Sequence, residues 1–353
     1  MNYETIRDVK IKGQVVLVRV DYNVPLEDGK IVNDLRIRAS LPTLQFLREQ
    51  GAKKIILISH LGRPEGRDKN LSLKVVADKL KKLIPEVDFV DDVSGPDVES
   101  KVKKMPKGGI LLLENLRFYK GEEKNSSEFI REIIDSTGAD LYVQDGFAVV
   151  HRAHASTSAV SEHLPVYAGL LVEKEIENLE KVIKKPEHPF VMIIGGAKID
   201  DKAPLIKKFL KTADHIIVGG KIAADGYVAE NDKIYVAEDF DEDSEGNKLD
   251  VGPLSTVKIA EILKDAKTIV WNGLMGKAED PAYSTASTVV AEILGKKTDA
   301  ETVICGGDTT GFVENLTEDH KNLQYSLIST GGGAALEFLS GKKLPGLEAI
   351  EKK

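Results

Sequence analysis

The sequence predicts an α/β protein made of two doubly wound, Rossmann-like parallel-sheet lobes that a hinge helix joins. At 353 residues the chain is longer than one hydrophobic core usually accommodates, so two domains are expected. Short apolar runs alternate with helical patterns along the chain, which is typical of a parallel sheet covered by helices on both faces. We place the lobes at residues 1–170 and 186–334 and the hinge helix at residues 171–185.

The composition is that of a globular enzyme. Hydrophobic residues make up 42% of the chain and charged residues 30%. The net charge of −8 argues against a protein that binds nucleic acid through its bulk charge. No stretch approaches the roughly 18 apolar residues of a membrane span, and the first residues lack the pattern of a secretory signal. The one cysteine, Cys305, follows apolar residues, so we expect a buried thiol in a cytoplasmic protein without disulfides.

The first lobe alternates predicted strands and helices. The expected strands are 14–20, 55–59, 87–90, 110–113 and 141–144, and the expected helices are 33–50, 72–83 and 126–135. Open parallel sheets place ligands at the carboxyl ends of their strands. Polar residues that follow these strands are therefore candidates for a binding site.

Cationic and imidazole side chains recur at these strand ends and helix starts. They are Arg19, Arg36, His60, Arg63, Arg117, Arg152 and His154. A single surface arginine is usually a solvated charge, but seven such groups along one edge of one sheet would form an anion site. Guanidinium groups suit phosphate and carboxylate, so the expected ligand is a small, highly charged metabolite.

The hinge helix, roughly residues 169–185, is expected to end before Pro186 and Pro189. Beyond it the strand and helix patterns resume. We expect strands at 190–194, 215–218 and 268–271, helices at 201–211, 222–230 and 255–264, and an exposed acidic loop at 238–250.

Four strand ends of the second lobe are rich in glycine. They lie at residues 195–198, 271–276, 303–310 and 329–334. Glycine lets the backbone turn sharply and approach a ligand closely. Lys198 and Lys202 add two ammonium groups at a helix N-terminus, where an anion is favoured. Any one glycine pair could be an ordinary turn, but the four together predict a nucleotide site, with Asp308 able to hold Mg²⁺ directly or through water.

Eight motifs, spread over nearly the whole chain, resemble those of phosphoglycerate kinase. In the first lobe they are residues 18–25, 59–64, 114–118 and 151–154. In the second they are residues 195–198, 271–273, 306–309 and 329–334. The resemblance implies a hinge-bending kinase that transfers a phosphoryl group between 1,3-bisphosphoglycerate and ADP, with Mg²⁺, to give 3-phosphoglycerate and ATP. It also implies small-molecule partners only, a monomer, and residues 335–353 returning to the first lobe.

The resemblance assigns roles to individual residues. The 3-phosphoglycerate site would consist of Asp21, Asn23, Arg36, His60, Arg63, Arg117 and Arg152. The nucleotide site would consist of Gly196, Lys198, Lys202, Asn272, Glu279, Gly306, Gly307, Asp308 and Thr309. Within it, Glu279 would meet the ribose and Asp308 the metal. Arg36, Lys198 and the amides around Gly307 and Gly332 would act on the transferring phosphoryl group.

The chain also departs from the family pattern. Leu274 stands where the family usually has proline, and Gly146 where it usually has alanine. Only about fifty residues separate Lys221 from Trp271, roughly half the expected length. Because this region normally helps to build the adenine pocket, base recognition is where the chain differs most.

Two other functions are alternatives to the kinase. A non-catalytic phosphoglycerate sensor with a degenerate nucleotide pocket would fit the shortened segment, but Lys198, Lys202 and Asp308 are all present and disfavour it. A nicotinamide dehydrogenase would require Gly-x-Gly-x-x-Gly after an early strand, with an acidic residue about 20 positions later. The sequence has no such fingerprint.

Overall fold

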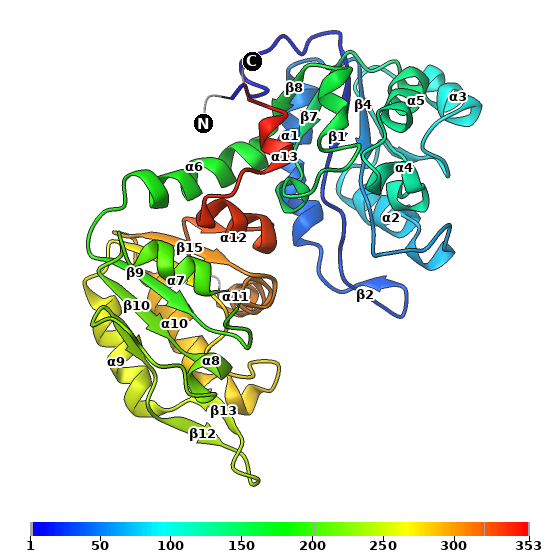
Figure 1. Ribbon diagram of the computed structural model, residues 1–353. Helices are drawn as coiled ribbons and strands as arrows, with labels where there is room; N and C mark the ends of the chain where they lie inside the picture. The colour runs from blue at the N-terminus through cyan, green and yellow to red at the C-terminus, as the bar shows by residue number, and fades with distance from the viewer. Residues whose placement is uncertain (1–2, 201, 321, 352–353) are drawn as a thin grey trace. The chain divides into compact units, whose positions relative to one another are not determined.

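The computed structural model describes residues 3–200, 202–320 and 322–351, and the chain divides into two compact units (Figure 1). Unit 1 contains the chain up to Lys174 together with the segment from Lys343 onward, and unit 2 spans Glu175–Lys342. Residues 335–342, which the sequence analysis grouped with the first lobe, lie in unit 2. The helix α6, Leu170–Lys184, covers the predicted hinge helix and contains the boundary between the units.

Unit 1 is built on a six-stranded sheet in which all strands are parallel. Its order is β5 (Val87–Phe89), β6 (Gly109–Leu112), β4 (Lys54–Ile58), β1 (Val15–Arg19), β7 (Leu141–Gln144) and β8 (Val166–Ala168). From β1 the chain first moves to the β4 side and later returns to place β7 on the other side. The strand order therefore reverses between β1 and β7, and such sheets bind ligands at this point.

Alternate residues of each strand enter two separate cores. Val16 and Val18 join a cluster with α1 (Leu35–Glu49) and α2 (Lys74–Leu83). Leu17 points to the other face, in a cluster with α3 (Pro96–Lys104) and α5 (Ser127–Thr137). Because successive strand residues face opposite sides, strands buried on both faces must be apolar throughout. The predicted doubly wound sheet is confirmed.

The remaining elements of unit 1 are short. They are β2 (Leu26–Glu27), β3 (Lys30–Ile31), α4 (Lys120–Glu123), α13 (Pro345–Glu348) and the 3₁₀ turns η1 (Lys69–Leu71), η2 (Leu116–Phe118), η3 (Phe147–Val149) and η4 (Ala159–Glu162). The C-terminal segment packs on this unit. Gly346 donates its N–H to the carbonyl of Val150 at 2.8 Å, and a Cβ at Gly346 would lie 2.8 Å from the Val150 Cα.

Unit 2 repeats the same architecture with a second all-parallel sheet. Its order is β11 (Ile234–Val236), β10 (His215–Val218), β9 (Phe190–Ile194), β14 (Thr268–Asn272), β15 (Glu301–Cys305) and β16 (Leu327–Ile328). The strand order reverses between β9 and β14. Cys305, at the end of β15, is fully buried, as predicted.

The helices of unit 2 are α7 (Ala203–Phe209), α8 (Gly220–Ala224), α9 (Pro253–Lys264), α10 (Thr285–Lys296), α11 (Gly307–Asp319) and α12 (Gly332–Ser340), with one 3₁₀ turn, η5 (Pro281–Tyr283). The predicted helix 201–211 is shorter at both ends, and Asp201 lies outside the described residues. The predicted helix 222–230 was wrong beyond Ala224. Gly226, with φ of 88°, takes a left-handed conformation that a helix cannot continue through.

The segment 238–250 is largely exposed, as predicted, but it is not a loop. Residues Phe240–Glu242 form β12, which pairs antiparallel with β13, Lys248–Val251. The Asp243 carboxylate closes the turn by accepting the backbone N–H groups of Glu245 and Asn247, each at 2.9 Å. Aspartate side chains commonly stabilise turns by accepting nearby backbone N–H groups. In a segment this rich in charge, the sequence pattern did not reveal the turn.

Within the described part of the chain, no helix combines the length and the apolar character that crossing a bilayer requires.

Candidate functional site

Unit 1 gathers its cationic residues at the carboxyl ends of its central strands. Arg19 ends β1, His60 follows β4, Arg117 lies in η2 beyond β6, and Arg152 follows β7. Burial and the charges of these three arginines and Arg36 together hold the pKa of His60 well below its ordinary value. Five of the seven groups predicted to converge therefore lie within electrostatic reach of one another.

Arg36 is held in place by groups that follow β1. Its Nη1 lies 2.8 Å from the Oδ2 of Asp21 and donates to the carbonyl of Asn23 at 2.9 Å. The Asp21 side chain is almost fully buried, whereas that of Arg36 keeps 30% of its surface exposed. The guanidinium is thus fixed on one side by protein and open to solvent on the other.

Asn23 and Arg117 are joined through Gly62. The Asn23 Oδ1 accepts the Gly62 N–H at 2.8 Å, and the Arg117 Nη1 donates to the Gly62 carbonyl at 2.6 Å. The adjacent Arg63 is exposed, and its charge lowers the pKa of Arg152 after the effect of burial. An ion pair and hydrogen bonds therefore link Asp21, Asn23, Arg36 and Arg117. The other three residues predicted for the 3-phosphoglycerate site, His60, Arg63 and Arg152, lie within electrostatic range of members of this group.

The positive charges of this group oppose one another. Burial, and next to it the charge of Arg152, lowers the pKa of Arg117 to about 10. Burial and then Arg117 lower the pKa of His154 to about 4. Because cations placed close together disfavour each other's charged forms, the cluster has the electrostatics of a site that is completed by an anion.

Arg19 and Glu122 support the cluster from the protein interior. Arg19 is 1% exposed; it donates to the Ser156 Oγ at 2.9 Å and approaches the His60 Nδ1 at 3.1 Å. The Glu122 carboxylate is fully buried and accepts the Ser156 N–H at 3.0 Å. Sequence analysis counted Arg19 among the anion-binding groups and missed Glu122, which stands in a run of charges that resembles an exposed segment.

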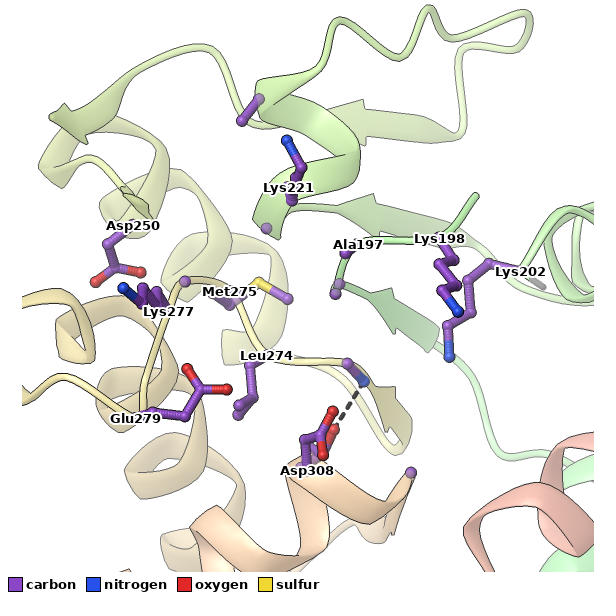
Figure 2. Close-up of a pocket in the computed structure, with 18 of the residues that line it drawn as sticks. Ala197, Lys198, Lys202, Lys221, Asp250, Leu274, Met275, Lys277, Glu279 and Asp308 are labelled. Carbon is purple, nitrogen blue, oxygen red and sulfur yellow. Dashed lines mark hydrogen bonds between the residues drawn. The ribbon is translucent and has the colours of Figure 1, made fainter. Parts of the chain in front are cut away.

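Unit 2 contains a cavity of about 580 Å³ at the carboxyl edge of its sheet (Figure 2). Its wall includes all the predicted nucleotide residues except Asn272, together with Gly332: Gly196, Lys198, Lys202, Glu279, Gly306, Gly307, Asp308 and Thr309. They come from the loops after β9, β14, β15 and β16. The sequence prediction of four glycine-rich strand ends on one site therefore describes the walls of this cavity.

The glycines allow these loops to pack backbone against backbone. A Cβ at Gly273, whose φ is 97°, would lie 2.2 Å from the Gly195 carbonyl oxygen. A Cβ at Gly332 would lie 2.8 Å from the Gly307 nitrogen. No side chain fits at either distance, so the floor of the cavity consists of main chain.

The cavity floor also presents helix N-termini. α11 begins at Gly307 and α12 at Gly332, and neither has a side-chain cap among the described residues. The first amides of a helix lack partners within the helix and favour anions. Asp308 lies in the first turn of α11 with its carboxylate exposed at the cavity, where Figure 2 shows it.

Asn272 has a different place from the one the sequence suggested. It is fully buried behind the cavity wall, where its Nδ2 donates to the Cys305 carbonyl at 2.8 Å. Its Oδ1 accepts a hydrogen bond from the Lys202 ammonium. Asn272 therefore orients Lys202 rather than lining the cavity itself.

Several wall residues escaped the sequence analysis. They are Lys221, Phe240, Lys248, Leu249, Lys277 and Leu336. Lys277 stood next to the predicted Glu279, so its position was a usable signal. Phe240 and Lys248 were hidden because they reach the cavity only through the hairpin of β12 and β13.

Comparisons with known proteins agree over the whole chain. The family model described as phosphoglycerate kinase matches residues 6–235 and 224–342. The chain is 39% identical to a phosphoglycerate kinase of Dictyoglomus turgidum over an alignment of 396 residues that covers 99% of this chain and 98% of the relative. Since the alignment is longer than the chain, the relative has residues that this chain lacks.

Two solved structures are similar over nearly their full lengths. The phosphoglycerate kinase from Coxiella burnetii has a TM-score of 0.80 at 32% identity, covering 99% of this chain and 98% of that one. The phosphoglycerate kinase from Pyrococcus horikoshii OT3 has a TM-score of 0.86 at 27% identity, covering 98% of both chains.

Proposed function

The chain belongs to the phosphoglycerate kinase family, and from this premise we propose how its residues divide the work of the reaction. The activity is that of a phosphoglycerate kinase of glycolysis, a phosphotransferase with a carboxyl group as acceptor. The phosphoryl group leaves the C1 acyl phosphate of 1,3-bisphosphoglycerate for the β-phosphate of ADP, which yields 3-phosphoglycerate and ATP, and the reaction is reversible.

We assign 3-phosphoglycerate to the cationic cluster of unit 1. The open side of Arg36, fixed by Asp21 and Asn23, is suited to a carboxylate or phosphate oxygen. The buried Arg117 and the exposed Arg63 extend the positive surface from the sheet edge outward. The fixed and half-open Arg36 guanidinium carries this assignment. Burial, and after it the charge of Arg152, lowers the pKa of Arg117, and a bound anion would favour the charged form of that side chain.

We assign the nucleotide to the cavity of unit 2. Lys202, oriented by Asn272, and the first amides of α11 and α12 would hold the phosphates. Lys198 would meet the transferring phosphoryl group, and Glu279 would accept from the ribose hydroxyls. The main-chain floor formed by the glycines lets a polyphosphate approach closely.

The residues present fit a Mg²⁺ ion that accompanies the nucleotide. Within the described residues no group of three or more His, Cys, Asp or Glu side chains could hold a metal alone. Asp308 offers one exposed carboxylate at the cavity. Mg²⁺ commonly takes one or two protein carboxylates and completes its shell with phosphates and water. Asp308 would therefore hold it, and the ion would neutralise phosphate charge when bound.

Transfer of a phosphoryl group requires in-line alignment and positive charge around its equatorial oxygens. The attacking oxygen is already anionic, on ADP or on the 3-phosphoglycerate carboxylate, so no general base is required. Arg36, Lys198 and the amides at Gly307 and Gly332 would supply the stabilising charge. Because each substrate is assigned to its own lobe, turnover requires hinge closure of the two lobes, which would also exclude water from the acyl phosphate.

A coupled assay of 3-phosphoglycerate phosphorylation by ATP with Mg²⁺ tests the proposal. We expect turnover that depends on both substrates and on the metal. Binding of 3-phosphoglycerate without turnover and without nucleotide binding would instead support the non-catalytic sensor.

A further inference from the structure

The nucleotide cavity has two chemically different ends. Figure 2 shows Lys198 and Lys202 on one side and Asp250, Lys277 and Glu279 on the other, with Leu274 and Met275 between them. If the phosphates lie at Lys198 and Lys202, the base must lie toward the far end. The inference below rests on that assignment from the proposed function.

Most polar groups near the far end already have partners. The Asp250 side chain is 2% exposed, and its carboxylate accepts the N–H groups of Val251 at 2.9 Å and Ala286 at 3.0 Å. Lys221 pairs with Asp225 at 2.7 Å. Lys248 lies 4.8 Å from the centre of the Phe240 ring. Each of these three groups therefore has a partner within unit 2.

Lys277 is different. Its backbone is fixed by an N–H bond to the Leu249 carbonyl at 2.7 Å, and its side chain is exposed at the cavity. Within the described residues its ammonium makes no hydrogen bond or ion pair. Its charge contributes only slightly to the lowered pKa of Asp243, which is lowered chiefly by hydrogen bonds from Asn247. The ammonium is therefore a donor available to a ligand.

The edge of a purine determines what such a donor can do. Guanine and hypoxanthine present the O6 and N7 acceptors side by side, the pair to which lysine commonly donates. Adenine carries an amino group in place of O6, and an ammonium cannot accept a hydrogen bond from it. We propose that Lys277 is a specificity-determining residue of the nucleotide site, and that 6-oxopurine nucleotides bind at least as tightly as adenine nucleotides.

Calorimetry with ADP, GDP and IDP on the full chain tests the proposal. The wild-type protein should bind GDP and IDP at least as tightly as ADP. Lys277→Met should weaken GDP and IDP roughly tenfold or more, the effect of one hydrogen bond to a charged group, and should change ADP much less. Lys277→Arg should restore the preference, and Lys258→Ala, an exposed lysine of α9 paired with Glu261, serves as the control.

Three outcomes would overturn the proposal. The first is that ADP binds the wild type far more tightly than GDP and IDP do. The second is that Lys277→Met weakens the binding of all three nucleotides equally, which would mean that Lys277 acts on the phosphates. The third is that GDP alone responds, which would mean that Lys277 does not contact the O6 and N7 edge that GDP and IDP share. If ATP supports turnover in any of these cases, the proposed function stands and only the role of Lys277 fails; if no nucleotide binds, both fail.

Discussion

The two units use different parts of the chain to favour anions. Unit 1 uses side chains: Arg117 is 7% exposed, and Arg36 is fixed against the buried Asp21. Unit 2 uses main chain: Gly273 and Gly332 approach neighbouring backbone too closely for any side chain, and two helices begin at the cavity. The difference predicts different sensitivities. Anion binding by unit 1 should be lost when a side chain is removed. Anion binding by unit 2 should be lost when a Cβ is added to a glycine, and its lysines are the exception because they act through their side chains.

The exception, Lys198, should give the largest effect. Lys198→Ala removes a charge proposed to act on the transferring phosphoryl group, so kcat should fall by about 10²–10³, while the dissociation constants of ADP and 3-phosphoglycerate change little. Steady-state kinetics together with calorimetry separate the two. Lys207→Ala, an exposed lysine of α7, is the control. Near-normal turnover in the Lys198 variant would remove this residue from the mechanism.

Arg36→Ala tests the side-chain site. It removes the guanidinium and leaves the buried Asp21 carboxylate without its partner, so affinity for 3-phosphoglycerate should fall by about 10- to 100-fold and turnover should fall with it. ADP affinity, measured by calorimetry, should stay unchanged. Arg38→Ala is the matched control, because Arg38 lies on the same helix and is 56% exposed in an ion pair with Asp34. A comparable loss of ADP affinity would contradict the division of labour between the units.

Gly273→Ala tests the main-chain site. The added Cβ meets the Gly195 carbonyl and the φ of 97° is unfavourable, so unit 2 should lose about 1–3 kcal/mol of stability and bind ADP more weakly. The single tryptophan, Trp271, is buried in this unit, so its fluorescence reports urea unfolding there. Gly311→Ala, within α11 and without neighbours inside 4 Å, should be neutral or slightly stabilising. Equal effects at the two positions would argue against the packed floor.

Asp145 should give the smallest effect, in the pH dependence of stability. It lies beyond β7, fully buried, accepts the Leu171 N–H at 3.0 Å, and burial raises its pKa from 3.8 to about 7. At a pH between these two values the folded protein retains a proton that the unfolded chain releases. The stabilisation from this proton is therefore full below about pH 4 and is lost as the pH rises through about 7. From pH 6 to 7.5 this costs about 1 kcal/mol.

Asp145→Asn should flatten that pH dependence, since the amide oxygen can still accept the Leu171 N–H. The free energy of unfolding, measured by circular dichroism across this pH range, checks the expectation. An unchanged slope would assign the pH dependence to other buried carboxylates, such as Glu122, whose pKa burial also raises.

Comparison of sequence and structure shows which features local patterns can reveal. The apolar runs of β1 and β9 are buried on both faces, so their strand character and the parallel sheet were predictable. The cations after β1, β4 and β6 were predictable as a group, because parallel strands deliver their carboxyl ends to one edge. The family, confirmed by the comparisons, followed from eight motifs at strand ends of both units.

The sequence by itself determined the two doubly wound sheets and the strand ends that carry polar residues, because periodicity, glycine and charge are properties of neighbouring residues. Only the tertiary structure decided that Asn272 lies behind Lys202, that Glu122 supports Arg19, and that the hairpin of β12 and β13 brings Phe240 and Lys248 to the cavity. Those relations join residues far apart in the chain, where burial and backbone contact, rather than local pattern, determine what each side chain can do.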